Sequence, residues 1–293
     1  MDTRTLKQFV ILADTLHFGR ASEACHVSAS ALSRSIKQLE GEVGVKLLER
    51  DNRSVELTRH GEQFLEFARD SLTQWDVLRN ALLEDADALR GEVSIYCSVT
   101  ASYSFLFDLL SEFRRDYPRI EIKLHTGDPE HAVQRVLAGE EDIAIGARPR
   151  SLPATLAFKP MTDTPLVFIA AANSDEYTSL SGGKAYMDDW QRTPMILSET
   201  GLARRRVDSW FRALGMQPQI YAQVAGNEAI VSMVSLGFGV GVVPRIVLDN
   251  SPLASNVRVL DVRPKLESYA VGLFALRKKL KSPLIEAFWS QIR

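Results

Sequence analysis

The sequence predicts an α/β protein built from three consecutive parts. Short helical patterns fill residues 1–58, one long amphipathic pattern follows over residues 59–90, and short apolar strands alternate with helical stretches over residues 91–293. The chain has 293 residues, of which 45% are hydrophobic, so it is long enough to bury two or more cores.

Residues 1–58 are expected to form three short helices. In each pattern the apolar side chains stand three or four positions apart, so that one face of the helix is buried. The second face carries small side chains, which allow helices to pack closely. The three faces consist of Leu6, Phe9, Val10 and Ala13; of Ala21, Ala24 and Cys25; and of Leu32, Ile36, Leu39 and Val43.

Local signals mark the ends of the third helix and the segment that follows it. Ser28 is placed to cap the first turn, because a serine hydroxyl accepts a hydrogen bond from a backbone N–H that has no helical partner. Gly44 is expected to end the helix. Beyond Gly44, the segments KLLER and SVELT flank an Asp-Asn turn, which predicts a small β-wing.

The exposed face of the third helix is a candidate surface for reading DNA. Short hydroxyls permit close approach to phosphates and base edges, and Arg34 can reach a guanine in the major groove. A solvated helix face is the alternative interpretation. The spacing of helix, short turn and helix favours DNA, as do the cap at the turn and the arginines of the wing. The residues assigned to DNA contact are Ser28, Ser30, Ser33, Arg34, Lys37, Arg50 and Arg53.

Overall charge gives no support for nucleic-acid binding. The chain has a net charge of −2, and residues 1–58 carry eight Lys and Arg against eight Asp and Glu. The DNA hypothesis therefore depends on the arrangement of particular side chains and not on bulk charge.

Residues 59–90 predict one long helix that joins two chains. Mostly apolar residues recur with a 3, 4, 3, 4 spacing, and neither proline nor glycine interrupts the pattern after Gly61. Such a helix would be about 45 Å long, too long for most compact domains. We therefore expect a dimerising linker, and packing within its own domain is the alternative. The seam positions are 65, 68, 72, 75, 79, 82, 86 and 89.

Residues 91–293 predict a two-lobed domain with a largely parallel sheet. Lobe I is expected over about 91–162 and 268–293, and lobe II over about 163–267. A return strand in SYAVGLFALRKK and a terminal helix in PLIEAFWSQIR would complete lobe I. Two lobes of this kind leave a cleft at the carboxyl ends of their strands.

The stretch ASEACHVSASALSRSIKQLEGEVGVKLLERDNRSVELTRHG resembles the winged helix-turn-helix of the LysR-type transcriptional regulators. That family's order of a DNA-binding head, a linker helix and an effector domain like a periplasmic binding protein matches the three parts over essentially the full chain. The resemblance implies promoter DNA and RNA polymerase as partners. It also implies a homo-oligomer, either a dimer through the linker helix or a tetramer, and a small-molecule inducer with no cofactor.

Further stretches resemble those members of the family that activate the gene for ketol-acid reductoisomerase in branched-chain amino acid synthesis. They include HFGRASEACHVS, CSVTASYS, RRRVDSWFR and MVSLGFGVGVVPRIVLDNSP. This resemblance implies 2-acetolactate or 2-aceto-2-hydroxybutyrate as inducer. The stretch SDEYTSLSGGKAYMDD matches no motif, so the outer face of lobe II has no assignment.

Small polar groups gather in loops that follow predicted strands, and they predict a site for a small carboxylate. Free N–H groups and the helix dipole favour an anion at a helix start, and an arginine adds positive charge. The three adjacent arginines 204–206 are about 100° apart on a helix, so they cannot all face one cleft. The residues that we assign to effector binding are Ser98, Thr100, Ser102, Thr126, Asp128, Arg148, Ser198 and Arg204.

Several other classes of protein are disfavoured. No apolar run is long enough for a membrane span, and the N-terminus lacks a signal-peptide pattern, which predicts a cytoplasmic protein. Cys25 and Cys97 have no metal-ligand or redox spacing. GFGVGVVP lacks the spacing of a dinucleotide loop, and no hydrolase or P-loop motif occurs. A soluble small-acid-binding protein or enzyme with a helical N-terminal extension stays as the alternative.

Overall fold

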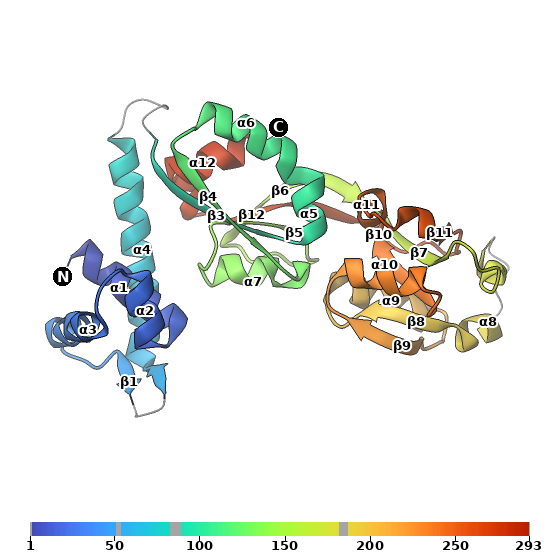
Figure 1. Ribbon diagram of the computed structural model, residues 1–293, viewed down its shortest axis with the longest axis horizontal. Helices are drawn as coiled ribbons and strands as arrows, with labels where there is room; N and C mark the ends of the chain where they lie inside the picture. The colour runs from blue at the N-terminus through green and yellow to red at the C-terminus, as the bar shows by residue number, and fades with distance from the viewer. Residues whose placement is uncertain (1, 51–53, 83–88, 182–186, 293) are drawn as a thin grey trace. The chain divides into compact units, whose positions relative to one another are not determined.

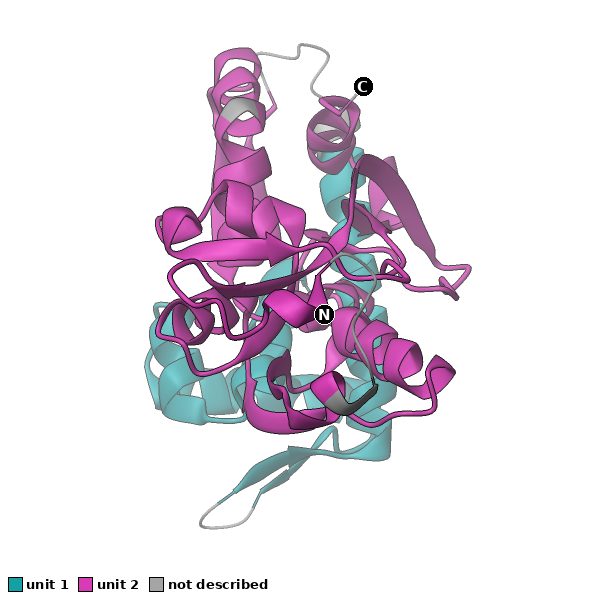
Figure 2. Ribbon diagram, turned by 90° about the vertical axis from the view of Figure 1, so that its right-hand side faces the viewer, with its two compact units in different colours: residues 1–84 teal, residues 85–293 magenta. Residues whose placement is uncertain are grey.

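The three helices expected near the N-terminus are present in the computed structural model, which describes residues 2–50, 54–82, 89–181 and 187–292. They belong to the first of two compact units, residues 1–84 and 85–293, coloured separately in Figure 2. The helices, labelled in Figure 1, are α1 (Thr3–Thr15), α2 (Phe18–Ala24) and α3 (Ala29–Val43).

The ends of α3 are set by the residues that the sequence indicated. Ser28 Oγ accepts a hydrogen bond from the Ala31 N–H at 3.2 Å, which confirms the predicted cap. Gly44 ends the helix with φ +81°, a left-handed conformation that costs glycine little. Both signals are local, so they could be read without knowledge of the fold.

The apolar stripes of α1 and α3 form the core of the first unit, with two exceptions to the prediction. Leu32, Ile36 and Leu39 are buried as expected, but Val43 at the last position of α3 is exposed, and so is Ala24 in α2. The α3 serine at position 35 donates to the buried Gln8 side chain at 2.6 Å and so ties α3 to α1.

A two-stranded antiparallel wing follows α3, as predicted, and Glu40 fastens it to that helix. The strands are β1 (Leu48–Arg50) and β2 (Val55–Leu57). Glu40 Oε1 accepts from the backbone N–H groups of Leu47 and Leu48 at 2.9 and 3.1 Å, and Glu40 Oε2 pairs with Arg50 at 2.9 Å. Arg53, predicted at the wing tip, lies outside the described residues.

The long helix α4 spans Arg59–Ala81, and its seam differs from the predicted one. Leu65, Ala68 and Leu72 pack against the core of their own unit, so the first half of the seam follows the intrachain alternative. Leu89 was wrongly placed on the helix, because it lies beyond α4 and is buried in the core of the second unit. Seam position 86 lies outside the described residues.

Exposed apolar side chains of α4, with Leu82 just beyond its end, form a stripe that coincides only in part with the predicted seam. Phe67, Trp75, Leu78 and Leu82 all have large exposed fractions, with 47% for Trp75 and 53% for Leu78. Their spacing places them on one side of the helix. Trp75 and Leu82 are positions of the predicted seam, whereas Phe67 and Leu78 lie next to its positions 68 and 79. We call these four residues the exposed stripe.

Lobe I of the second unit is a five-stranded sheet between helices. In the sheet order β4-β3-β5-β12-β6, the first three strands run parallel, and β12 is antiparallel to both of its neighbours. Helices α6 and α12 cover one face, where the rings of Phe113 and Phe288 lie 5.1 Å apart, and α7 covers the other (Figure 1). The elements are β3 (Gly91–Cys97), α5 (Val99–Ala101), η2 (Ser102–Leu106), α6 (Phe107–Asp116), β4 (Ile120–Thr126), η3 (Pro129–His131), α7 (Ala132–Leu137), β5 (Ile143–Ala147), β6 (Leu156–Thr164), β12 (Tyr269–Leu276), η6 (Lys279–Lys281) and α12 (Pro283–Ser290).

Lobe II repeats this plan with a second five-stranded sheet, ordered β11-β7-β10-β8-β9. Strands β10, β8 and β9 run parallel, and the two remaining pairs are antiparallel. An aromatic cluster that includes Trp190 and Trp210 packs on one face, and α10 and α11 cover the other. The elements are β7 (Leu166–Ala171), η4 (Thr178–Leu180), α8 (Met187–Arg192), β8 (Pro194–Ser198), α9 (Gly201–Ala213), β9 (Gln219–Val224), α10 (Asn227–Ser235), β10 (Val240–Pro244), α11 (Arg245–Asp249), η5 (Ala254–Asn256) and β11 (Val257–Leu260).

The expectation of a largely parallel sheet was wrong in detail. The chain crosses between the lobes twice, from β6 into β7 and from β11 to β12, and the crossing segments add antiparallel strands to each sheet. The predicted return strand and terminal helix are confirmed as β12 and α12. Among the described residues, no helix is both long enough and apolar enough to cross a membrane.

The two cysteines should differ strongly in reactivity. Cys97 is fully buried, and burial raises the pKa of its thiol to about 12, whereas Cys25 at the end of α2 is half-buried and the pKa of its thiol is raised less. The thiolate is the reactive form, and a pKa near 12 leaves roughly a thousandfold less of it than an ordinary cysteine has. In the native protein, a thiol-specific dye should label Cys25 within minutes and Cys97 only after unfolding. Equal labelling rates would contradict this burial.

Candidate functional site

The candidate DNA surface on α3 is open along one face of the helix. Arg34 and Lys37 are exposed, Ser30 is exposed one turn before Arg34, and Ser33 is half-buried. Arg34 and Lys37 have no ion-pair partner among the residues that the structure describes. Two long cations and two short hydroxyls are therefore available on one face for a polyanion.

The serines at 28, 30 and 35 have structural partners as well. Ser28 caps α3 and its hydroxyl also lies 3.1 Å from that of Ser30, while the serine at 35 bonds to Gln8. The Ser28 hydroxyl already accepts a hydrogen bond from the first turn of α3. Its proposed DNA contact would therefore have to use its O–H donor or its second lone pair.

A basic depression beside the wing contains cations that the sequence analysis did not single out. It has a volume of about 880 Å³ and is lined by Lys37, Lys46, Arg50, Arg59 and His60, together with Glu40 and Glu49. Lys46 and Arg59 flank the wing in sequence, which was the available signal. Arg50, expected to be free for DNA, pairs with Glu40 and its guanidinium lies 5.0 Å from the centre of the Phe18 ring, so its first role is to hold the wing.

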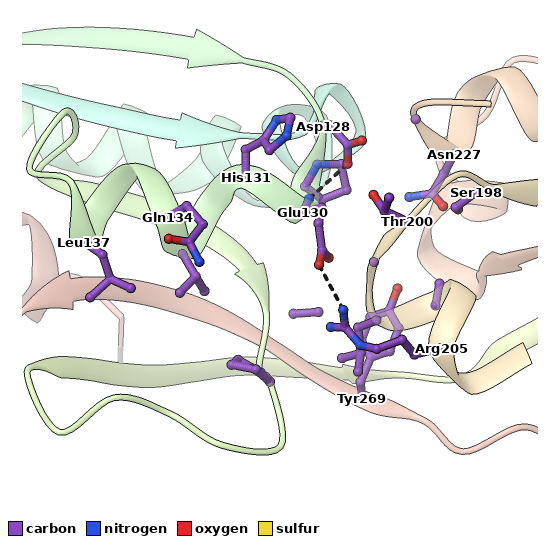
Figure 3. A pocket seen from close by; sticks show the side chains of 18 of the residues that line it. Asp128, Glu130, His131, Gln134, Leu137, Ser198, Thr200, Arg205, Asn227 and Tyr269 are labelled. Atoms are coloured by element: carbon purple, nitrogen blue, oxygen red, sulfur yellow. Dashed lines mark hydrogen bonds and ion pairs between the residues drawn. The ribbon is translucent and has the colours of Figure 1, made fainter. Parts of the chain in front are cut away.

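The candidate effector site is a cavity of about 410 Å³ between lobes I and II (Figure 3). Lobe I contributes the η3 and α7 residues Asp128, Glu130, His131 and Gln134, and lobe II contributes the loops that start α9 and α10. This volume lies within the range of small-molecule sites. The polar side chains from lobe II are Ser198, Thr200, Arg205 and Asn227.

Two helix starts line this cavity with unpaired backbone donors. Thr200 precedes α9 but its side chain makes no hydrogen bond to that helix, and Gly226, which precedes α10, has no side chain that could cap it. Both helices have nine residues or more, so each presents free N–H groups and the positive end of its dipole. The lobe II wall is therefore suited to an anion.

A carboxylate of lobe I already reaches toward one of these starts. Arg205 Nη1 donates to Glu130 Oε1 at 3.2 Å, the contact drawn in Figure 3. Gly201 begins α9 with φ +101°, and a Cβ built there would lie 2.8 Å from Glu130 Oε2. Glycine at 201 thus leaves room for Glu130, which holds negative charge where a ligand carboxylate is expected.

The three adjacent arginines have three different environments, and the one expected at the cavity is not there. Arg204 is inside the lobe, where it bonds to Asp208 at 2.9 Å, to the Ser198 carbonyl at 3.0 Å and to Gln223 at 2.7 Å. It does not line the cavity, whereas Arg205 does. Arg206 packs over the Tyr269 ring at 5.1 Å.

Thr100 also binds an internal carboxylate. The Thr100 backbone N–H donates to Glu228 Oε1 of lobe II at 2.9 Å, and the Thr100 hydroxyl donates to the same oxygen. Ser98 caps α5 by accepting from the Ala101 N–H at 3.1 Å, and Ser102 donates to the Val99 carbonyl at 2.6 Å. None of these three predicted site residues lines the cavity between the lobes.

The remaining predicted residues divide in the same way. Asp128 and Ser198 line the cavity. The Asp128 carboxylate accepts a hydrogen bond from the Glu130 N–H at 3.0 Å, and the Asp128 backbone carbonyl accepts one from the Tyr96 hydroxyl at 2.9 Å. Thr126 is exposed at the end of β4, and Arg148 is exposed with its guanidinium 5.3 Å from the centre of the Phe158 ring. The sequence analysis missed Glu130, Thr200 and Asn227, and it considered Arg205 within the 204–206 cluster but chose Arg204.

Comparison with known proteins identifies the family. Residues 3–62 match the family described as "Bacterial regulatory helix-turn-helix protein, lysR family", and residues 86–293 match the "LysR substrate binding domain". The chain belongs to the LysR family. The family resemblance drawn from the sequence is thereby confirmed, and this LysR-type chain is a DNA-binding transcriptional regulator with a domain for small-molecule effectors.

Full-length relatives agree with this assignment. The HTH-type transcriptional activator IlvY of Salmonella typhimurium is 44% identical over 293 residues, which cover 99% of this chain and 98% of the relative. The IlvY activator of Haemophilus influenzae is 40% identical over 293 residues and covers both chains completely. A full-length OxyR variant from Pseudomonas aeruginosa, at 25% identity, matches the LysR-type fold with a TM-score of 0.73 over 100% of this chain and 95% of its own.

Proposed function

We propose that this LysR-type regulator activates the gene for ketol-acid reductoisomerase in branched-chain amino acid synthesis, and that 2-acetolactate or 2-aceto-2-hydroxybutyrate is its inducer. The observation that carries the proposal is the cavity between the lobes, which joins two helix starts without side-chain caps to Arg205. The full-length relatives named IlvY activators support the choice of pathway.

The cavity chemistry suits an acetohydroxy acid, which carries one carboxylate, one hydroxyl and one ketone. The start of α9 and Arg205 can bind the carboxylate. Ser198, Thr200 and Asn227 stand near them on the lobe II side and offer both donors and acceptors (Figure 3). Leu137 and Leu202 supply apolar walls for the alkyl groups.

DNA binding requires two copies of the chain at a two-fold site. The exposed stripe of α4 supplies the contact between two copies, because apolar side chains on a helix surface are buried when a second helix packs on them. The dimer, or a tetramer built from two dimers, would present paired α3 helices to promoter DNA. Such an activator would work with RNA polymerase in the cytoplasm.

Titration calorimetry on the full-length protein tests the effector part of the proposal. We expect 2-acetolactate and 2-aceto-2-hydroxybutyrate to bind more tightly than pyruvate or 2-hydroxyisobutyrate, because each of the latter lacks one of the three polar groups. A mobility shift on promoter DNA then separates a regulator from a binding protein or enzyme. Absence of any DNA complex would overturn the proposed function.

A peroxide-sensing role is a less suitable alternative, although a relative at 27% identity is named a hydrogen peroxide-inducible genes activator. Oxidation by peroxide begins at a thiolate. The fully buried Cys97, with a thiol pKa near 12, carries almost none, and burial also raises the pKa of Cys25.

Arg34→Ala should weaken operator binding by about 1–3 kcal/mol, the usual contribution of one base-reading contact. The side chain is exposed, so the fold should be preserved. The measurement is a fluorescence titration of operator DNA at fixed salt, with Arg119→Ala as matched control, because Arg119 is an exposed arginine of the second unit. If both variants bind the operator like the wild type, α3 does not read bases through Arg34.

A further inference from the structure

A second cavity, of about 350 Å³, contains four arginines beside α9. Arg205, Arg206 and Arg212 come from α9 in lobe II, and Arg150 comes from the segment after β5 in lobe I. Leu202 and Asp208 also line this cavity. We call this cavity the arginine pocket.

The carboxylates near the arginine pocket do not balance its four guanidinium groups. One Glu267 carboxylate serves both Arg150 at 3.3 Å and Arg206 at 3.4 Å, and its side chain is 62% exposed. Arg205 pairs with Glu130 at 3.2 Å, and Asp208 is engaged by Arg204, which lies outside the pocket. Arg212 has no ion-pair partner among the described residues. The pocket therefore keeps an excess of positive charge.

Arg206 is the most constrained of the four. Its side chain is only 10% exposed, its Nη1 donates to the Glu267 carbonyl at 2.7 Å, and burial lowers the pKa of its guanidinium. Its buried Nε lies 3.4 Å from the Glu267 carboxylate yet forms no hydrogen bond. A buried charged donor without an acceptor is costly, so an anion that takes the place of the exposed Glu267 carboxylate would satisfy it.

We propose that the arginine pocket is a second anion site, which binds a small doubly charged anion of the phosphate class. A tetrahedral phosphate offers several oxygens to arginine forks approaching from different directions, whereas a single carboxylate offers two. The site is separate from the proposed effector cavity, although Arg205 lines both. The chain would then respond to a second signal besides its inducer.

An anion bound in the arginine pocket would also help to hold the two lobes together. Arg150 belongs to lobe I and the other three arginines to lobe II, so one anion would connect the two lobes. Since Arg205 also faces the effector cavity, the two ligands would share a side chain. Linkage requires that any effect of one ligand on the other be reciprocal.

The test is calorimetric titration of the full-length protein with inorganic phosphate, and separately with glycerol 1-phosphate, at constant ionic strength. Wild type should bind at least one of them at millimolar concentrations or below, and the tighter one identifies free phosphate or a phosphate monoester as the source. Arg150→Ala and Arg212→Ala should each weaken phosphate binding about fivefold, which is the usual contribution of one exposed ion pair. Arg119→Ala should bind like wild type.

Titration of the same variants with 2-acetolactate separates this proposal from the proposed function. Arg150 and Arg212 do not line the effector cavity, so their alanine variants should bind 2-acetolactate within about twofold of wild type, which also shows that they are folded. Failure of wild type to bind either phosphate would overturn the second site and leave the effector site intact. Equal phosphate binding by wild type and both variants would also overturn it.

Discussion

Replacing Trp75 and Leu78 together with aspartate should split the dimer and abolish operator binding. Both side chains are about half exposed in one chain and belong to the exposed stripe of α4, where we place the second copy. Two carboxylates in that contact would have to be desolvated without partners, which costs several kcal/mol. We expect operator affinity to fall by more than about a hundredfold, because one DNA-binding head cannot hold a two-fold site alone.

Analytical ultracentrifugation measures the first effect, and a mobility shift measures the second. The matched control is Gln63→Asp with Thr73→Asp, which adds the same charge to the same helix outside the exposed stripe. This control should sediment like wild type. If the Trp75 and Leu78 variant keeps the wild-type sedimentation coefficient, the dimer contact lies elsewhere.

Leu72→Asp distinguishes the exposed stripe from the seam predicted by spacing alone. Leu72 packs against the core of the first unit, so a charge there should lower the melting temperature of that unit before it changes assembly. The sequence could show that α4 carries two apolar sides, but not which side meets its own domain. That choice depends on where α1 and α3 fold back, which periodicity does not encode.

The same limit explains why the N-terminal unit was predicted more accurately than the effector cavity. The cap at Ser28, the end at Gly44 and the wing are local signals, and all three are present. The contacts Thr100–Glu228 and Glu130–Arg205 join residues that are 128 and 75 positions apart. No local pattern reports such pairs, since they depend on how one lobe meets the other.

The choice of Arg204 failed for a specific geometric reason. Arg204 was chosen as the arginine nearest the start of a helix expected over residues 204–214, whereas α9 begins three residues earlier, at Gly201. Adjacent side chains on a helix are about 100° apart, so Arg204 turns toward Asp208 and Gln223 while Arg205 lines the cavity. The left-handed conformation of Gly201 and the approach of Glu130 fix this early start, and both are tertiary features.

Arg205→Ala should weaken binding of 2-acetolactate by about tenfold to a hundredfold, which corresponds to the loss of a charge-assisted hydrogen bond of roughly 1.5–3 kcal/mol. Arg204→Ala, at the adjacent position, is the variant to compare with it. It removes three contacts inside lobe II and should lower thermal stability, with a smaller direct effect on the ligand. Calorimetry and thermal denaturation on both variants separate these roles.

Glu130→Gln should change 2-acetolactate affinity in the opposite direction. Glu130 holds a negative charge beside Arg205 and the start of α9, where the ligand carboxylate is expected, and two like charges about 4–6 Å apart repel even when partly screened. Glutamine keeps an acceptor for Arg205 but removes the charge, so we expect binding about threefold to tenfold tighter. Glu140→Gln, an exposed carboxylate outside the cavity, is the control. Opposite shifts for Arg205→Ala and Glu130→Gln, with the control unchanged, would place the ligand carboxylate between these two side chains. Weaker binding by Glu130→Gln would instead mean that Glu130 contacts the ligand as an acceptor, for example from its hydroxyl, and that the carboxylate binds at the start of α10.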